Sequence, residues 1–151
     1  MGAAQACPIG GLGSILLATD GSTMSGGAVR EALSLAKTCG SKLYVISVIE
    51  VNPEFEALAP GLVEKVEKKT RTYVESVKTK ASKAGITCET IITEGETPYK
   101  NIVDAARKKK VHMIVMGRHG RTGLKRLLMG SVTAKTIGHS TCKVMVVPEA
   151  A

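Results

Sequence analysis

Apolar and polar residues follow two different periodicities along this chain, and the two alternate. Nearly continuous apolar runs, which are typical of buried strands, cover 14–19, 43–49, 111–116 and 142–147, whereas the more mixed segment 87–93 is typical of an edge strand. Apolar residues at helical spacing lie between these runs and predict helices over about 23–39, 62–84, 98–110 and 131–139. Residues 51–61 are expected to form a loop.

Capping residues indicate where the helices begin and end. Ser22 or Thr23 can cap the first helix, and Gly40 is its natural end because glycine readily adopts the left-handed C-cap conformation. Gly85 ends the long second helix in the same way, and Pro98 suits the first position of the third. Strands that alternate with helices predict a single α/β domain in which helices cover both faces of a parallel sheet.

Size and charge restrict the classes of function. With 151 residues the chain has the length of one domain, and no apolar run approaches the roughly 20 residues of a membrane helix, so no membrane span is expected. The net charge of +8 favours anionic partners. One Phe, three Tyr and no Trp argue against the aromatic platform on which proteins stack single-stranded nucleic acid, so nucleic acid is not an expected partner.

The cysteines and the first residues point to an ordinary intracellular domain. Cys7, Cys39, Cys88 and Cys142 are widely spaced, which fits neither a structural zinc site nor a thioredoxin-like pair. We predict reduced thiols in a cytoplasmic protein. Residues 1–13 are small and Gly-rich and lack the regions of a signal peptide, so a flexible tail is expected before a domain over 14–151.

One glycine-rich segment carries most of the functional information. It follows a predicted strand, leads into a predicted helix, and contains Gly117, Gly120, Gly130, Ser131 and Thr133. Glycines let the backbone approach an anion, and the first N–H groups of a helix point at it with the positive end of the helix dipole. Because the two hydroxyls add donors, the segment predicts a phosphate cradle and hence nucleotide binding.

Other predicted strands contribute to the same place. In parallel sheets, ligands bind at the carboxyl ends of the strands where the strand order reverses, and Asp20, Val48 and the segment from Gly117 all lie at such ends. Asp20 can alternatively cap the first helix. His119 can be a phosphate contact, a general base or an exposed polar residue. Positive charge along the segment, which either neutralises phosphates or forms a solvated face, comes from Arg118, Arg121, Lys125 and Arg126.

Three other nucleotide motifs are excluded. Ser25-Gly26-Gly27 resembles the start of the ATP pyrophosphatase loop, but Ala28 and Val29 replace the acidic and hydroxyl residues of that loop. The pair Gly11 and Gly13 precedes its strand, whereas a dinucleotide fingerprint follows one, and no Walker GxxxxGK[ST] sequence occurs.

The spacing of Gly117, Gly120, Gly130 and Ser131 resembles the G-2x-G-9x-G-(S/T) signature of ATP-binding universal stress proteins. The resemblance extends over about 14–148 and includes the Asp20 turn and the closing strand. It implies a Rossmann-like three-layer sandwich with a five-stranded parallel sheet of order 3-2-1-4-5 and four helices. It also implies a homodimer formed through the last strand, Lys143 to Val147.

The resemblance implies an adenine-nucleotide site in which Asp20 and Val48 contact the adenosine and the glycine segment holds the phosphates. The implied ligand is ATP, with Mg²⁺ held through the phosphates. No catalytic residue and no metal-ligating residue is assigned. The full set of implied nucleotide-binding residues is Thr19, Asp20, Val48, Met116, Gly117, His119, Gly120, Gly130, Ser131, Val132 and Thr133.

The function implied by the resemblance is that of a regulator or sensor in the stress response, whose nucleotide occupancy modulates binding of a protein partner. Two alternatives stay open: a slow Mg²⁺-dependent ATPase, and a sensor of AMP or a cyclic adenine nucleotide. Residues 114–148 contain no Asp or Glu, which leaves Asp20 as the carboxylate near the loop. Because phosphoryl transfer needs a metal holder and a positioned water, any hydrolysis is expected to be slow.

Overall fold

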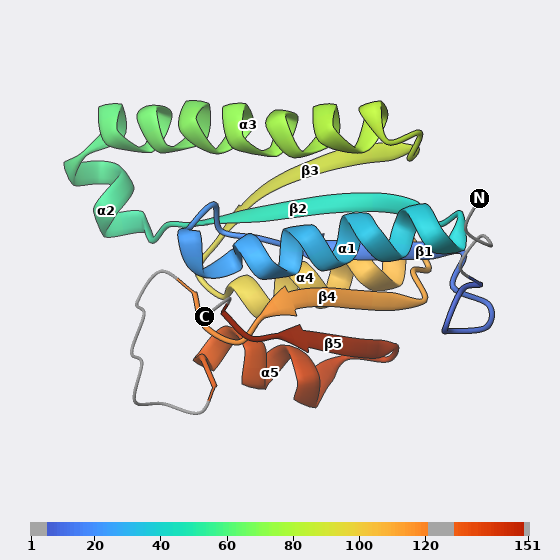
Figure 1. Cartoon of the computed structure of the whole chain (residues 1–151). Helices are drawn as coiled ribbons and strands as arrows, with labels where there is room; N and C mark the ends of the chain where they lie inside the picture. Colours follow the sequence, from blue (N-terminus) through green and yellow to red (C-terminus); the bar gives the residue numbers. More distant parts are fainter. Residues whose placement is uncertain (1–5, 121–128, 150–151) are drawn as a thin grey trace.

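The computed structural model describes residues 6–120 and 129–149, which form helical layers around one parallel sheet (Figure 1). Within these residues the sheet has five strands, β1 (Ser14–Ala18), β2 (Lys42–Glu50), β3 (Cys88–Gly95), β4 (Met113–Gly117) and β5 (Lys143–Val147). Their order is β3-β2-β1-β4-β5, and each pairing is parallel. The predicted parallel sheet and its strand order are confirmed.

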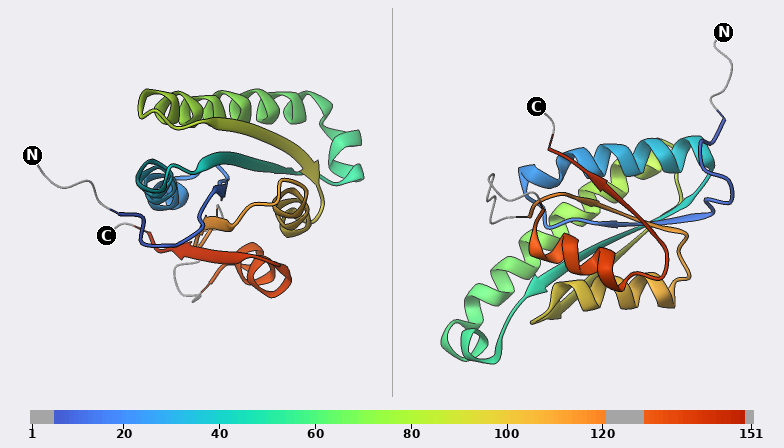
Figure 2. Two further views of the ribbon diagram at one scale, coloured as in Figure 1. Left: turned by 90° about the vertical axis from the view of Figure 1, so that its right-hand side faces the viewer. Right: turned by 90° about the horizontal axis from the view of Figure 1, so that it is seen from below.

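Helices pack on both faces of the sheet (Figure 2). One core cluster joins the sheet to α1 and α3, and the other joins it to α4 and α5. None of the helices in the described part of the chain is long and apolar enough to cross a bilayer. The helical elements are η1 (Thr23–Ser25), α1 (Gly26–Cys39), α2 (Pro53–Leu58), α3 (Pro60–Lys83), α4 (Pro98–Lys108) and α5 (Ser131–His139).

The two halves of the sheet differ in length at the carboxyl end. The last residue of β1, Ala18, pairs with Ile46 of β2. The ladder between β2 and β3 continues beyond this point to the pair Glu50 and Gly95. A two-stranded ribbon therefore projects beyond the end of β1, while β4 and β5 end together at Gly117.

Local backbone preferences explain the end of α1 and the start of α4. Gly40 follows α1 with φ 65°, and its N–H donates to the carbonyl of Ala36, as the C-cap prediction requires. Pro98 occupies the first position of α4, as predicted. The predicted cap at Ser22 or Thr23 is wrong, because a 3₁₀ turn precedes α1 and the side chain of Ser22 makes no cap bond. The hydroxyl of Ser22 donates to Asp20 instead.

The loop predicted over 51–61 is also wrong, since α2 lies within it and α3 already begins at Pro60. The Asn52 side chain accepts a hydrogen bond from the N–H of Phe55 at 2.7 Å, and Pro53 follows at the first helical position. These are local start signals. No residue of α2 is buried, so the helix lacks the apolar periodicity by which the other helices were predicted.

The prediction of reduced thiols is wrong for two of the four cysteines. Cys7 and Cys39 form a disulfide that joins the segment before β1 to the last residue of α1. The two residues are 32 apart in sequence, and only the return of the chain along α1 brings them together. Leu12 is buried in the core and Ile9 packs against it, so residues 6–13 have core contacts as well as a covalent link. Cys88 and Cys142 are free thiols.

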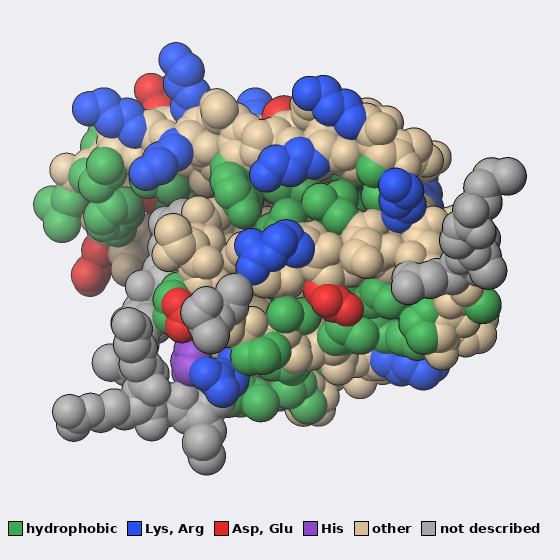
Figure 3. Space-filling model, viewed as in Figure 1, with side chains coloured by type: hydrophobic (Ala, Val, Ile, Leu, Met, Phe, Trp, Pro, Cys, Tyr) green, Lys and Arg blue, Asp and Glu red, His purple; other side chains and the backbone are tan. Residues whose placement is uncertain are grey.

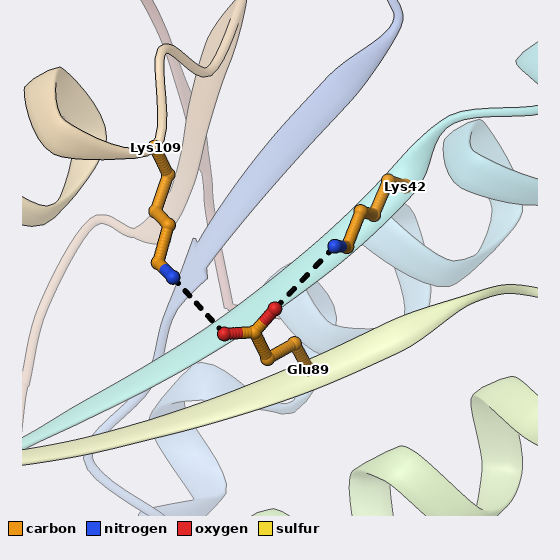
Figure 4. A network of polar contacts seen from close by, with 3 residues as sticks. All are labelled: Lys42, Glu89 and Lys109. Carbon is orange, nitrogen blue, oxygen red and sulfur yellow. Dashed lines mark hydrogen bonds and ion pairs between the residues drawn. The ribbon is translucent and has the colours of Figure 1, made fainter.

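An exposed ionic network ties β2, β3 and the end of α4 together (Figure 4). The carboxylate of Glu89 accepts from Nζ of Lys109 at 3.0 Å and lies 3.4 Å from Nζ of Lys42. These contacts, with Lys109 first, lower the pKa of Glu89. Both ammonium groups also lie over the ring of Tyr44. Lys109 follows α4 directly, where a cation interacts favourably with the helix dipole.

Candidate functional site

The carboxyl ends of the strands meet at one end of the molecule, on the left in Figure 1. The turn after β1 is fixed to β2, because the N–H of Thr19 donates to the carbonyl of Ile46 at 3.0 Å. The segment after β4 is fixed to β5, because the N–H of Arg118 donates to the carbonyl of Val147 at 3.1 Å. The sheet thus holds the two segments that the sequence assigns to the site.

The turn between β1 and η1 orients Asp20. Its carboxylate accepts from the N–H of Ser22 at 2.9 Å and from the Ser22 hydroxyl at 2.6 Å, which is an Asx-type turn ahead of the helix. The alternative of a direct cap on α1 does not hold, since Ser25 is the N-cap of that helix. The Thr19 and Ser25 hydroxyls are hydrogen-bonded at 2.8 Å beneath the turn.

The three signature glycines lie where a Cβ atom would be in tight contact with a neighbour. A Cβ at Gly117 would stand 3.3 Å from the carbonyl oxygen of Met24, and one at Gly130 would stand 3.3 Å from that of Arg118. A Cβ at Gly120 would stand 3.1 Å from Oδ2 of Asp20. Because two of these obstacles are backbone atoms, they cannot move aside cheaply. The close approach of Gly120 to Asp20 joins the ends of β1 and β4 in one site.

The glycine segment leads directly into α5. The N–H of Gly130 donates to the carbonyl of Arg118 at 2.8 Å, which closes the segment onto itself. The Thr133 hydroxyl is buried and donates to the carbonyl of Gly117 at 2.8 Å. The first main-chain bond of the helix comes from Ala134 to Gly130, so helix geometry leaves the amides of residues 131–133 without intrahelical acceptors. These amides are the donors that an anion can use.

The predicted site residues lie at different depths. Thr19, Met116 and His119 are 6%, 4% and 7% exposed, and Val48 is half-buried against the second core cluster. Met116 therefore belongs to the core beneath the site. Of the three alternatives for His119, the exposed polar residue does not hold, because the residue is buried. Ser131 is exposed.

The basic residues of the segment divide into two groups. Arg118 is half-buried, and its Nε is buried without a hydrogen-bond partner in the described part of the chain. Arg121, Lys125 and Arg126 lie outside the described residues. Among the described residues, no group of three or more His, Cys, Asp or Glu side chains could hold a metal ion.

Sequence reasoning missed one residue that shapes the site. The ring of Tyr73, on α3, lies 3.5 Å from where a Cβ of Gly21 would stand, and its hydroxyl is 3.4 Å from Oγ1 of Thr19. Tyr73 supports the Asp20 turn from behind. Tyr73 precedes the buried residue Val77 by one helical turn, so the sequence could have predicted that Tyr73 faces the core side of α3. The sequence could not predict that its ring contacts the turn between β1 and η1.

A comparison with known protein families agrees with the spacing of the glycines and with their packing around Asp20. The sequence model of the universal stress protein family matches residues 12–148. The chain belongs to the universal stress protein family.

Individual relatives agree with this assignment. The chain is 36% identical over 137 residues to the universal stress protein MJ0531 of Methanocaldococcus jannaschii, covering 88% of this chain and 80% of that protein. The solved structure of MJ0577, from the same organism, superposes with a TM-score of 0.82 at 28% identity over 93% of this chain and 98% of that one. A universal stress protein in complex with cAMP has a TM-score of 0.67 at 24% identity over 92% and 98% of the two chains, which shows a shared fold.

Proposed function

We propose that this universal stress protein binds an adenine nucleotide, with ATP as the main ligand, and that occupancy of the site regulates binding of a protein partner. The observation that carries the proposal is the assembly of Gly120 against Asp20 and of Gly130 against the backbone at Arg118. This packing presents a bare backbone and the start of α5 to an anion beside a fixed carboxylate.

Each part of the site has a distinct proposed task. The amides at the start of α5 and the backbone at Gly117 and Gly120 hold the phosphates. The carboxylate of Asp20 accepts from the ribose hydroxyls, and Val48 contacts the adenosine. Since the Thr133 hydroxyl is already donated to Gly117, that residue serves through its main-chain amide. The complex of a related fold with cAMP supports an adenine nucleotide and keeps AMP and cyclic nucleotides as alternative ligands.

Regulation by occupancy is favoured over turnover. Hydrolysis of ATP needs a metal ion and an oriented water, and Mg²⁺ would here be held through the phosphates. In this proposal the carboxylate of Asp20 accepts from Ser22 through Oδ1 and from the ribose hydroxyls, so it is not assigned to hold the metal. A slow Mg²⁺-dependent ATPase is the second candidate, and any turnover is expected to be slow.

The proposed regulator is a homodimer that pairs through β5. This strand is at the edge of the sheet, and its residues from Val144 to Val147 are half-buried in the single chain. An apolar edge strand is a template for pairing with another strand, and a second copy of β5 would cover it.

The test is to identify the small molecules that the freshly purified protein releases on denaturation, by mass spectrometry, and to titrate ATP, AMP and cAMP by calorimetry. Gly130→Ala places a methyl group against the Arg118 carbonyl, whereas Gly138→Ala, in the helix α5 that follows Gly130, has open space and is the control. We expect the wild type and Gly138→Ala to release ATP on denaturation. In Gly130→Ala the affinity for ATP is expected to fall by roughly tenfold or more relative to the wild type. Equal binding by all three proteins would contradict the proposed site.

A further inference from the structure

A group of apolar side chains is exposed at the end of the molecule where β2 joins α2. Phe55 and Leu58 of α2 and Leu62 of the first turn of α3 are 37%, 86% and 46% exposed. Figure 3 shows hydrophobic side chains gathered over α2. We call these three residues the α2 surface. Single exposed apolar residues are common on soluble proteins, but neighbouring ones indicate contact with a partner.

A hollow opens beside the α2 surface. Its volume is about 290 Å³, and it is lined by Glu50, Val51, Asn52, Phe55 and Glu96. The hollow lies between the projecting end of the β2–β3 ribbon and α2, and Phe55 belongs to both the hollow and the α2 surface. The space is of the size that an aliphatic side chain of a partner can enter.

The charge around the hollow is opposite to that of the whole protein. Residues 43–64 contain four glutamates and no Lys or Arg, and residues 84–99 contain three glutamates and no Lys or Arg, although the net charge is +8. Glu50 and Glu96 line the hollow, Glu54 and Glu56 lie on α2, and none of these four makes an ion pair within the described part of the chain. These four glutamates, called the glutamate rim below, lie beside the apolar side chains of Val51 and Phe55.

We propose that the α2 surface and its hollow dock a short cationic amphipathic segment of a partner protein. Leu-type side chains of that segment enter the hollow and cover Leu58, while its Lys or Arg side chains face the glutamate rim. Apolar anchors with complementary charge around them are the usual composition of such an interface. The lining of the hollow begins at Glu50, two residues after Val48, so β2 connects the hollow directly to the proposed nucleotide site.

Two other occupants fit the charge less well. A second copy of this chain, pairing face to face, would bring two glutamate rims together, and like charges across an interface are costly. An anionic membrane surface would be repelled by the same rim. The docking surface would be the binding site of the partner whose regulation is proposed above. Docking itself requires no nucleotide.

The experiment uses a fluorescent synthetic peptide with Leu and Lys at helical spacing, and the same peptide with Glu in place of Lys. Binding is followed by fluorescence anisotropy with the full chain at low and physiological salt. We expect the Lys peptide to bind more weakly as salt rises and the Glu peptide not to bind. Binding of both peptides alike, or of neither, would overturn the proposal.

Variants locate the contact. Leu58→Ser changes a residue that is 86% exposed, so the fold is kept, and the double variant Glu54→Lys with Glu56→Lys reverses the rim. The double variant Glu31→Lys with Glu149→Lys makes the same change in net charge at two exposed residues outside α2 and the hollow, and is the matched control for charge. Each test variant is expected to weaken binding of the Lys peptide by roughly tenfold, and the control by less than about twofold. Equal affinity for all variants would refute docking at this surface.

The alternative occupants give separate signals. If Leu58→Ser converts a dimer to a monomer in light scattering, the occupant is a second copy and the proposal fails. If the wild type sediments with anionic vesicles and Leu58→Ser does not, the occupant is a membrane and the proposal fails. Gly130→Ala is expected to bind the Lys peptide with the affinity of the wild type. Failure of the proposed nucleotide site would therefore leave the docking proposal unaffected.

Discussion

The hydrogen bond from Thr133 to Gly117 is predicted to hold the glycine segment in place, and Thr133→Val tests this directly. Thr133 is 3% exposed, and its hydroxyl donates a hydrogen bond of 2.8 Å to the carbonyl of Gly117. Gly117 is also a buried residue. Valine has nearly the same shape but no donor. The substitution therefore leaves a buried carbonyl without this partner, which costs about 2 kcal/mol.

A second threonine in the same helix provides the control. Thr136 is fully buried and donates at 2.7 Å to the carbonyl of Val132, one turn earlier in α5. That carbonyl also accepts the backbone N–H expected in an α-helix, so Thr136→Val leaves no carbonyl unsatisfied. Both variants exchange a buried hydroxyl for a methyl group. The difference between their stabilities therefore isolates the carbonyl of Gly117.

The measurement is urea unfolding of wild type and both variants, followed by circular dichroism, with thermal unfolding alongside. Thr133→Val is expected to lose about 2 kcal/mol more than Thr136→Val. For a chain of this size the loss corresponds to a Tm lower by roughly 4–8 °C. The affinity for ATP should fall in Thr133→Val alone. If the two variants differ by less than about 0.5 kcal/mol, the bond does not hold the segment and the reasoning is wrong.

Three further predictions concern other parts of the molecule. Val146→Asp places a charge on the edge strand β5 and should give a monomer in light scattering, whereas an unchanged dimer would exclude pairing through β5. Reducing the Cys7–Cys39 disulfide, which spans 32 residues, should lower the free energy of unfolding by about 3–4 kcal/mol in a chain-entropy account; unfolding curves with and without dithiothreitol measure this, and coincident curves would contradict it. The pKa of Glu89 is lowered chiefly by the bond from Lys109, so its contribution to stability is present above its ordinary pKa of 4.5 and is lost as the pH falls through the lower folded value; an NMR titration midpoint at or above 4.5 would refute this.

The sequence predicted those features that local geometry decides. Long apolar runs specify buried parallel strands, and Gly40 and Pro98 specify helix ends through their backbone preferences. The spacing of the glycines predicted the segment that approaches Asp20. The strand order itself came from the family resemblance, since periodicity identifies strands without ordering them.

The features that were missed depend on contacts between distant residues or lack an apolar face. Helix α2 buries nothing, so only its cap at Asn52 could have revealed it. The pairing of Cys7 with Cys39 depends on the path of the chain before β1. His119 is buried although it lies in a loop, and the support from Tyr73 depends on where α3 crosses the first turn. A local sequence pattern does not encode such contacts between residues that are distant in sequence.

The unequal lengths of the strands give the candidate site a direction. The β2–β3 ladder runs four residues past the pair of Ala18 with Ile46, from Ser47 to Glu50, which is a rise of about 13 Å at the usual spacing of a strand. A molecule bound at the end of β1 therefore has the projecting β2–β3 ribbon, a wall, on one side. On the other side β4 and β5 end at Gly117 and Val147 and do not project past it. The start of α5 lies on this lower side. An elongated ligand with one anionic end accordingly has a single favourable orientation, with its bulky end against the wall and its charge toward the helix.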